Sequence, residues 1–145
     1  MKSSFRELRL CQLDQSLSAF GDARQEVRPR HGWLRAVREA LGLSLEDVGK
    51  TLGINRSHVR WFETAEERER ITLAKLRRVA EAMDCEVVYA VVPKTGTVAE
   101  LAERRARAQA TEDVLDAEHN MALENQAPGN VKKLIEEETK RRLKQ

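Results

Sequence analysis

The stretch LSLEDVGKTLGINRSHVRWFETA, residues 43–65, decides the fold of this chain. Its apolar side chains recur at helical spacing on both sides of Gly53, a residue that can adopt the left-handed conformation of a tight turn. Gly49 lies where two such helices would cross most closely, so a small residue is needed there. The side chains spaced to fill the seam are Val48, Leu52, Ile54, Val59 and Phe62. The stretch therefore predicts two short helices joined by a turn, the helix-turn-helix arrangement.

Side chains that can cap helices mark where the predicted helices begin. Ser44 followed by Asp47 is a variant of the capping box, and Asn55 and Thr72 are suitable N-caps for the next two helices. The predicted segments are 33–41, 44–52, one opening at Asn55, and 71–83. Because each is too short to persist alone, we expect them to pack into a mainly α-helical bundle.

The helix that opens at Asn55 would enter the major groove of DNA. Arg56 and Ser57 lie at its N-terminal end and would approach the bases most closely, and arginine is the commonest reader of guanine. Arg60 lies one turn further and could reach a base or a phosphate. His58 is expected to contact phosphate or solvent. Two alternatives remain for Trp61: its ring contacts thymine methyl groups, or it packs against the protein.

Charge gives no independent sign of DNA binding. The chain has 26 Lys and Arg against 24 Asp and Glu, and residues 32–70 carry seven of each sign. Four acids follow the reading residues closely: Glu63, Glu66, Glu67 and Glu69. Binding must then depend on how the charges are arranged, with Arg68 and Arg70 expected to contact phosphates. Ser44 and Asn55, at the starts of the two helices, complete the expected DNA-binding residues.

After Asp84 the apolar pattern changes. CEVVYAVVP, residues 85–93, is rich in β-branched residues and predicts one C-terminal β-strand. A lone strand needs a partner, so pairing with the same strand of a second copy would give a two-fold dimer. The alternative is an extended segment that lies on the helical core.

A long helix is predicted from Thr97, its N-cap, to about Gln126. One stripe of this helix carries small or apolar residues: Ala99, Ala102, Ala106, Ala110, Val114, Ala117 and Met121. The stripe could pack on its own protein or be reserved for a partner. The breaker PGN at 128–130 precedes a charged terminal helix, which we expect to fray in solvent.

The length of 145 residues predicts one domain with appendages. We expect an N-terminal helix and linker at 1–31, the helix-turn-helix domain with its terminal strand at 32–93, and a C-terminal helical extension at 94–145. Isolated cysteines, the absence of a signal peptide and the absence of a membrane span predict a cytoplasmic protein. No catalytic motif is present, so we expect no enzymatic activity, no cofactor and no metal site.

Two resemblances extend these expectations. LGLSLEDVGKTLGINRSHVRWFE resembles the Cro and phage-repressor class of helix-turn-helix proteins. Together, LRLCQLDQSLSAF, RPRHGWLRAVREALG, ITLAKLRRVAEAMDCEVVYAVVPK and HNMALENQ resemble the family called mobile mystery protein A. This family resemblance implies a bacterial DNA-binding regulator encoded beside a Fic-domain protein, in an arrangement similar to a toxin-antitoxin pair.

Carried over by position, the phage-repressor pattern implies base readers at Arg56, Ser57 and Trp61. Leu45 stands where that pattern often has a glutamine for a phosphate contact. A leucine side chain donates no hydrogen bond, which removes one expected contact to the DNA backbone.

Three functional hypotheses follow. The leading one is a homodimeric, sequence-specific repressor that binds a palindromic double-stranded operator of its own operon. The alternative is an antitoxin-like interaction protein that neutralises the neighbouring Fic-domain protein through the long helix or the N-terminal helix, with DNA binding secondary. The third is a helical structural protein that binds no DNA.

Overall fold

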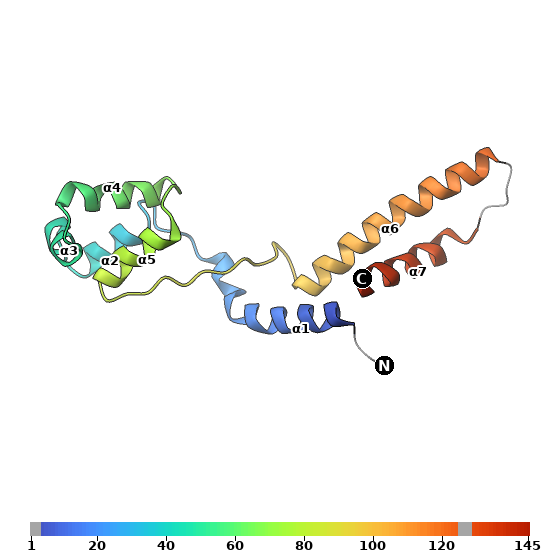
Figure 1. Ribbon diagram of the computed structural model, residues 1–145, viewed down its shortest axis with the longest axis horizontal. Coiled ribbons are helices and arrows are strands. Elements are labelled where there is room, and N and C mark those ends of the chain that lie inside the picture. The colour runs from blue at the N-terminus through green and yellow to red at the C-terminus, as the bar shows by residue number, and fades with distance from the viewer. Residues whose placement is uncertain (1–3, 125–128) are drawn as a thin grey trace. The chain divides into compact units, whose positions relative to one another are not determined.

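The computed structural model describes residues 4–124 and 129–145 (Figure 1). Within these residues the protein has seven α-helices and no β-strand, which confirms the mainly α-helical prediction. The chain forms two compact units. Residues 24–89 make up the first, and residues 1–23 and 90–145, called here the terminal unit, make up the second.

The 24–89 unit contains the predicted helix-turn-helix. Its helices are α2 (Trp33–Ala40), α3 (Leu45–Leu52), α4 (Arg56–Glu67) and α5 (Leu73–Ala82). They enclose one core, whose buried members are Leu34, Val48, Val59, Phe62, Val79, Ala80 and Met83. Leu52 and Ile54 pack against this core and stay partly exposed, so all five predicted seam residues lie where the pattern placed them.

Two glycines set the geometry of the turn between α3 and α4. Gly53 has φ +71°, the left-handed conformation, and ends α3. At Gly49, an added Cβ would lie 2.6 Å from the carbonyl oxygen of Ile54, closer than a real Cβ can approach. A larger residue at position 49 would therefore push the turn away from α3, and both predictions about these glycines are confirmed.

The predicted caps are present. The Ser44 hydroxyl accepts a hydrogen bond from the Asp47 N–H at 3.1 Å, and the Ser44 N–H donates to the Asp47 carboxylate at 2.7 Å. Asn55 Oδ1 accepts from the His58 N–H at 2.8 Å, and Thr72 caps α5 in the same way. These bonds satisfy N–H groups that a helix cannot pair internally, and they fix where α3, α4 and α5 begin.

The prediction of a β-strand at 85–93 is wrong. These residues have no strand assignment, and a hydrogen bond from the Cys85 N–H to the Ala80 carbonyl at 3.0 Å ties the segment to the end of α5. Cys85 and Val87 pack against the core, whereas Val88 is 66% exposed. A strand requires a neighbouring strand to bond with, and the described residues supply none. The start of the segment thus lies against the helical core as irregular chain.

The described part of the terminal unit contains three α-helices. They are α1 (Phe5–Leu17), followed by short 3₁₀ turns, α6 (Val98–Leu123) and α7 (Val131–Lys144). α7 returns alongside α6 (Figure 1), and α1 packs on both. The stripe of α6 is consequently buried at Ala106, Ala110 and Val114, which answers the question of whether it packs on its own protein. The predicted end of this helix, about Gln126, lies outside the described residues.

Specific contacts hold the two terminal helices, α1 and α7, within the terminal unit. α7 is not a fraying tail, because Thr139 is buried and the helix packs along α6. Asp14 of α1 accepts hydrogen bonds from the Val98 and Ala99 N–H groups at 2.7 and 3.1 Å. A carboxylate at the positive end of a helix is favourable, so Asp14 fastens α1 to the start of α6.

Candidate nucleic-acid interface

Five side chains on the first two turns of α4 face solvent, and we call them the reading face: Arg56, Ser57, His58, Arg60 and Trp61. All five were predicted from the sequence as DNA-binding residues. Neither Arg56 nor Arg60 forms an ion pair with any residue that the structure describes. Two guanidinium groups are therefore available to an external anion or base.

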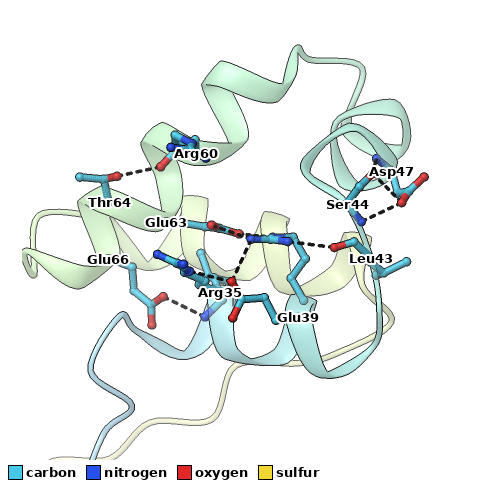
Figure 2. Close-up of polar contacts among 11 residues, drawn as sticks. Arg35, Glu39, Leu43, Ser44, Asp47, Arg60, Glu63, Thr64 and Glu66 are labelled. Carbon is cyan, nitrogen blue, oxygen red and sulfur yellow. Dashed lines mark hydrogen bonds and ion pairs between the residues drawn. The ribbon is translucent and has the colours of Figure 1, made fainter.

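The acids of α4 are engaged within the protein, beginning with Glu63. This residue is buried, and its carboxylate receives two hydrogen bonds from Arg38 of α2, with Nε to Oε1 at 2.5 Å (Figure 2). Arg38 also donates from Nη1 to the carbonyl of Leu43 at 2.9 Å. A buried, bidentate arginine contact of this kind holds α2, α4 and the turn before α3 together.

Glu66 supplies the cap that α2 lacks. Gly32, the N-cap residue, has no side chain to accept a hydrogen bond. The Glu66 carboxylate accepts from the Trp33 N–H at 2.7 Å and from the Leu34 N–H at 2.9 Å instead. Its negative charge also lies at the positive end of α2. This buried acid therefore belongs to the architecture of the fold.

Glu67 and Glu69 pair with residues that precede α2. Glu67 Oε1 lies 3.2 Å from Nδ1 of His31, and Glu69 Oε1 lies 3.6 Å from Nη1 of Arg28. Arg28 also donates to the backbone carbonyls of Glu66 and Glu67 at 3.3 and 3.1 Å. Each of the four acids that follow the reading residues thus has a cation or N–H partner. Glu63 and Glu69 are paired with arginines, Glu66 accepts from two N–H groups, and Glu67 lies beside His31, so all four acids are engaged within the 24–89 unit.

A polar cavity of about 470 Å³ runs beside α4, and we call it the arginine groove. The arginines that line it are Arg35, Arg38, Arg56 and Arg60. Ser44 and Leu45, at the start of α3, line it too, so the structure brings Ser44 together with two of the reading residues. Four glutamates, Glu39, Glu46, Glu63 and Glu67, line the same groove, so its charge is mixed and depends on which arginines are already paired.

The arginines of the groove differ in what they already bind. Arg35 Nε donates to Glu39 Oε1 at 2.8 Å, and this hydrogen bond raises the pKa of Arg35 and lowers the pKa of Glu39. Arg38 is held by Glu63. Arg56 and Arg60, by contrast, have no acidic partner among the described residues. The two arginines on α2 are therefore already paired with glutamates of the protein, whereas the two arginines on α4 are not.

Comparison with protein families agrees with this geometry. Residues 33–88 match the family model described as a helix-turn-helix domain. The chain contains a helix-turn-helix domain. The match runs from the start of α2 into the segment after α5, and it includes the reading face and the arginine groove. Comparison with curated proteins gives no match, and neither does comparison with solved structures.

The helix-turn-helix domain suggests that the protein binds DNA and is not an enzyme. Among the residues that the structure describes, no group of three or more His, Cys, Asp or Glu side chains could hold a metal ion. No helix in the same described ranges is long and apolar enough to cross a membrane.

Arg68 and Arg70 lie at the other end of α4 from Arg56. Both are exposed, and the backbone N–H of Arg70 donates to the Ala65 carbonyl at 2.7 Å, which fixes the loop. Because a helix rises about 1.5 Å per residue, roughly 18 Å of α4 separates them from Arg56. The helix-turn-helix domain therefore does not gather these two arginines into the groove, and their role as phosphate contacts stays a prediction.

Three contributors were not predicted from the sequence. Arg35 and Arg38 line the groove, and Lys75 of α5 places its ammonium 5.2 Å from the ring centroid of Trp61. The Arg35–Glu39 pair carries a signal that could have been used, because residues four apart lie on one face of a helix. Lys75 gives no such signal, since only packing brings α5 beside the reading face.

Proposed function

We propose that the protein is a sequence-specific DNA-binding transcriptional regulator that represses its own operon. One observation carries the proposal: Arg56 and Arg60 are exposed without an acidic partner, whereas the acids that follow them are engaged internally. The helix-turn-helix domain at 33–88 supports DNA as the ligand.

In the proposed complex the N-terminal turns of α4 enter the major groove. Arg56 donates two hydrogen bonds to the O6 and N7 atoms of a guanine, and Ser57 contacts an adjacent base edge. Arg60, one turn further along α4, contacts a base or the phosphate backbone. A phosphate lies at the mouth of the arginine groove, within reach of Arg56 and Arg60.

The regulator binds a palindromic operator as a homodimer. Because residues 32–70 have no net charge, one domain would gain little from counterion release, and a second copy doubles the phosphate and base contacts. Half-sites should be centred about 34 Å apart, one turn of the duplex, or a multiple of it. Light scattering of the protein with its operator should give two chains per duplex.

Fluorescence anisotropy with a labelled duplex from upstream of the gene tests the proposal at a fixed salt concentration. Arg56→Ala should weaken binding roughly 5- to 150-fold, because a bidentate arginine–guanine contact contributes about 1–3 kcal/mol. Arg105→Ala is the matched control: it removes the same charge from an exposed position on α6. Equal binding of the upstream and a scrambled duplex, or unchanged binding by Arg56→Ala plus Arg60→Ala, refutes the proposal.

A second function, binding and neutralising a neighbouring Fic-domain protein, rests on the apolar surface of the terminal unit. Phe5, Leu115 and Leu123 are 75%, 52% and 73% exposed. Since the small-residue stripe of α6 is largely covered by α1 and α7, these outer side chains would form the contact. The Fic-domain protein should then co-purify with the full chain and be lost from Leu115→Asp plus Leu123→Asp. Retention by that variant would exclude this surface.

A further inference from the structure

Trp61 is a large apolar side chain that the core does not need. Trp61 is 52% exposed, whereas its neighbour Phe62 is 3% exposed and fills the core together with Val59. Trp61 lies four residues after Ser57, and side chains four apart share one face of a helix. The indole therefore belongs to the reading face rather than to the inside of the domain.

The indole is held in place by three neighbours from two helices. Its ring lies 5.4 Å from that of Phe62 at 62° and 6.0 Å from that of His58 at 78°, both edge-on arrangements. The ammonium of Lys75 lies 5.2 Å from its centroid, within range of a cation–π interaction. Lys75 is in turn part of the capped first turn of α5, where its N–H donates to Thr72 at 3.3 Å. A bulky apolar ring is thus presented to solvent in a defined orientation.

We infer that Trp61 recognises the C5-methyl group of a thymine, with Lys75 as the residue that positions the indole. The major-groove edges of the bases carry hydrogen-bonding groups and one apolar group, the thymine methyl. An indole has a single donor and a large apolar surface, so on this helix it complements the methyl group better than any polar edge. The inference rests on the proposed DNA binding, and it adds a thymine to the operator beside the guanine expected at Arg56.

The test compares thymine with deoxyuridine, which lacks only the methyl group. Duplexes are first selected from a random pool by the full-length protein, and each thymine of the selected site is then replaced singly by deoxyuridine. Burying one methyl group contributes about 0.8 kcal/mol, so the replacement at the contacted thymine should weaken wild-type binding about fourfold. Trp61→Ala should bind the two duplexes equally.

The role of Lys75 is tested with the ratio of the affinities for the thymine and deoxyuridine duplexes. Lys75→Gln removes a charge, which weakens binding to both duplexes equally through the phosphates. If Lys75 positions the indole, Lys75→Gln also lowers the fourfold preference for thymine, and Lys75→Arg restores it. A purely electrostatic role for Lys75 would leave the preference unchanged and overturn this part of the inference.

A second measurement does not depend on the folding of a variant. 5-Iodouracil placed at the contacted thymine carries iodine where the methyl group was, and irradiation of the wild-type complex should cross-link it to the tryptic peptide WFETAEER, residues 61–68. Cross-linking to another peptide, a fourfold preference that persists in Trp61→Ala, or no deoxyuridine effect at any thymine overturns the inference while DNA binding stands. If the pool yields no preferred duplex, the proposed function itself fails.

Discussion

Replacing Glu66 with alanine should remove most of the stability of the 24–89 unit. The residue is 5% exposed, and its carboxylate is the acceptor for the Trp33 and Leu34 N–H groups at the start of α2. Gly32 cannot replace it, because the N-cap has no side chain. The alanine variant would leave both N–H groups without this acceptor inside the protein and remove a carboxylate from a helix N-terminus.

The magnitude follows from those losses. A buried N–H without a partner costs about 1–3 kcal/mol, and a carboxylate at a helix N-terminus contributes about 0.3–1 kcal/mol. Because the hydrogen bond to the Trp33 N–H is only partly buried, we expect a loss of about 3 kcal/mol for Glu66→Ala, in the lower half of that range. Glu66→Gln keeps one carbonyl acceptor and should lose about half as much. A single core of this size rarely supplies more than about 3–5 kcal/mol, which makes either loss easy to measure.

Tryptophan fluorescence during urea unfolding is the appropriate assay. The chain has two tryptophans, Trp33 and Trp61, and both lie in the 24–89 unit, so the signal reports this unit within the full chain. Glu81→Gln is the matched control, since Glu81 is exposed on α5 and forms no ion pair with a described residue; its effect should stay within about 0.5 kcal/mol. One unmade hydrogen bond costs roughly 1 kcal/mol. If the free energy of unfolding of Glu66→Ala lies within about 1 kcal/mol of the wild-type value, the capping role is refuted.

Two further predictions concern the same unit. Arg38→Ala should destabilise it by about 3 kcal/mol or more in urea unfolding, because the buried Glu63 carboxylate would lose its cation, and Arg38→Met plus Glu63→Leu should recover much of that loss. The hydroxyl of Ser44, followed by its backbone N–H, lowers the pKa of Asp47. The stability this gives is fully present above the ordinary aspartate pKa, about 3.9, and is lost as the pH falls through the lower folded value. Unfolding followed from neutral pH downward should show a smaller acid-induced loss for Asp47→Asn, and an equal loss would contradict the assignment.

The acids after the reading residues show where reasoning from the sequence stopped. Glu63, Glu66, Glu67 and Glu69 are visible in the sequence as a run of charge, from which it follows only that DNA binding must depend on how the charges are arranged. Their partners lie 25 to 41 residues earlier in the chain, at Arg28, His31, Trp33, Leu34 and Arg38. No local pattern relates positions so far apart, because it is the packing of α2 against α4 that brings them together.

The prediction of a β-strand at 85–93 was wrong for a related reason. Its β-branched composition is a sound local preference for extended backbone, and the structure has neither helix nor strand at these residues. Whether an extended segment becomes a strand depends on a neighbour with free N–H and C=O groups, and the described residues offer the helical core instead. Composition describes the backbone conformation, whereas pairing is a property of the tertiary structure.

The sequence by itself determined the features that depend on neighbours along the chain. Helix starts at Ser44, Asn55 and Thr72, the turn at Gly53, the close crossing at Gly49 and the seam all follow from spacing within one or two helical turns. So does the candidate reading face, since successive turns of α4 repeat every three to four residues. Few other conformations are possible for these features, because helix geometry fixes the hydrogen bonds and the side-chain directions within one or two turns.

Only the tertiary structure decided which charges are available and which surfaces are covered. It paired the four acids, left Arg56 and Arg60 free beside the arginine groove, and placed Lys75 over Trp61. It also covered the α6 stripe with α1 and α7. Electrostatic and packing partners are selected by distance in space, and that distance is set by how the helices cross rather than by their separation in sequence.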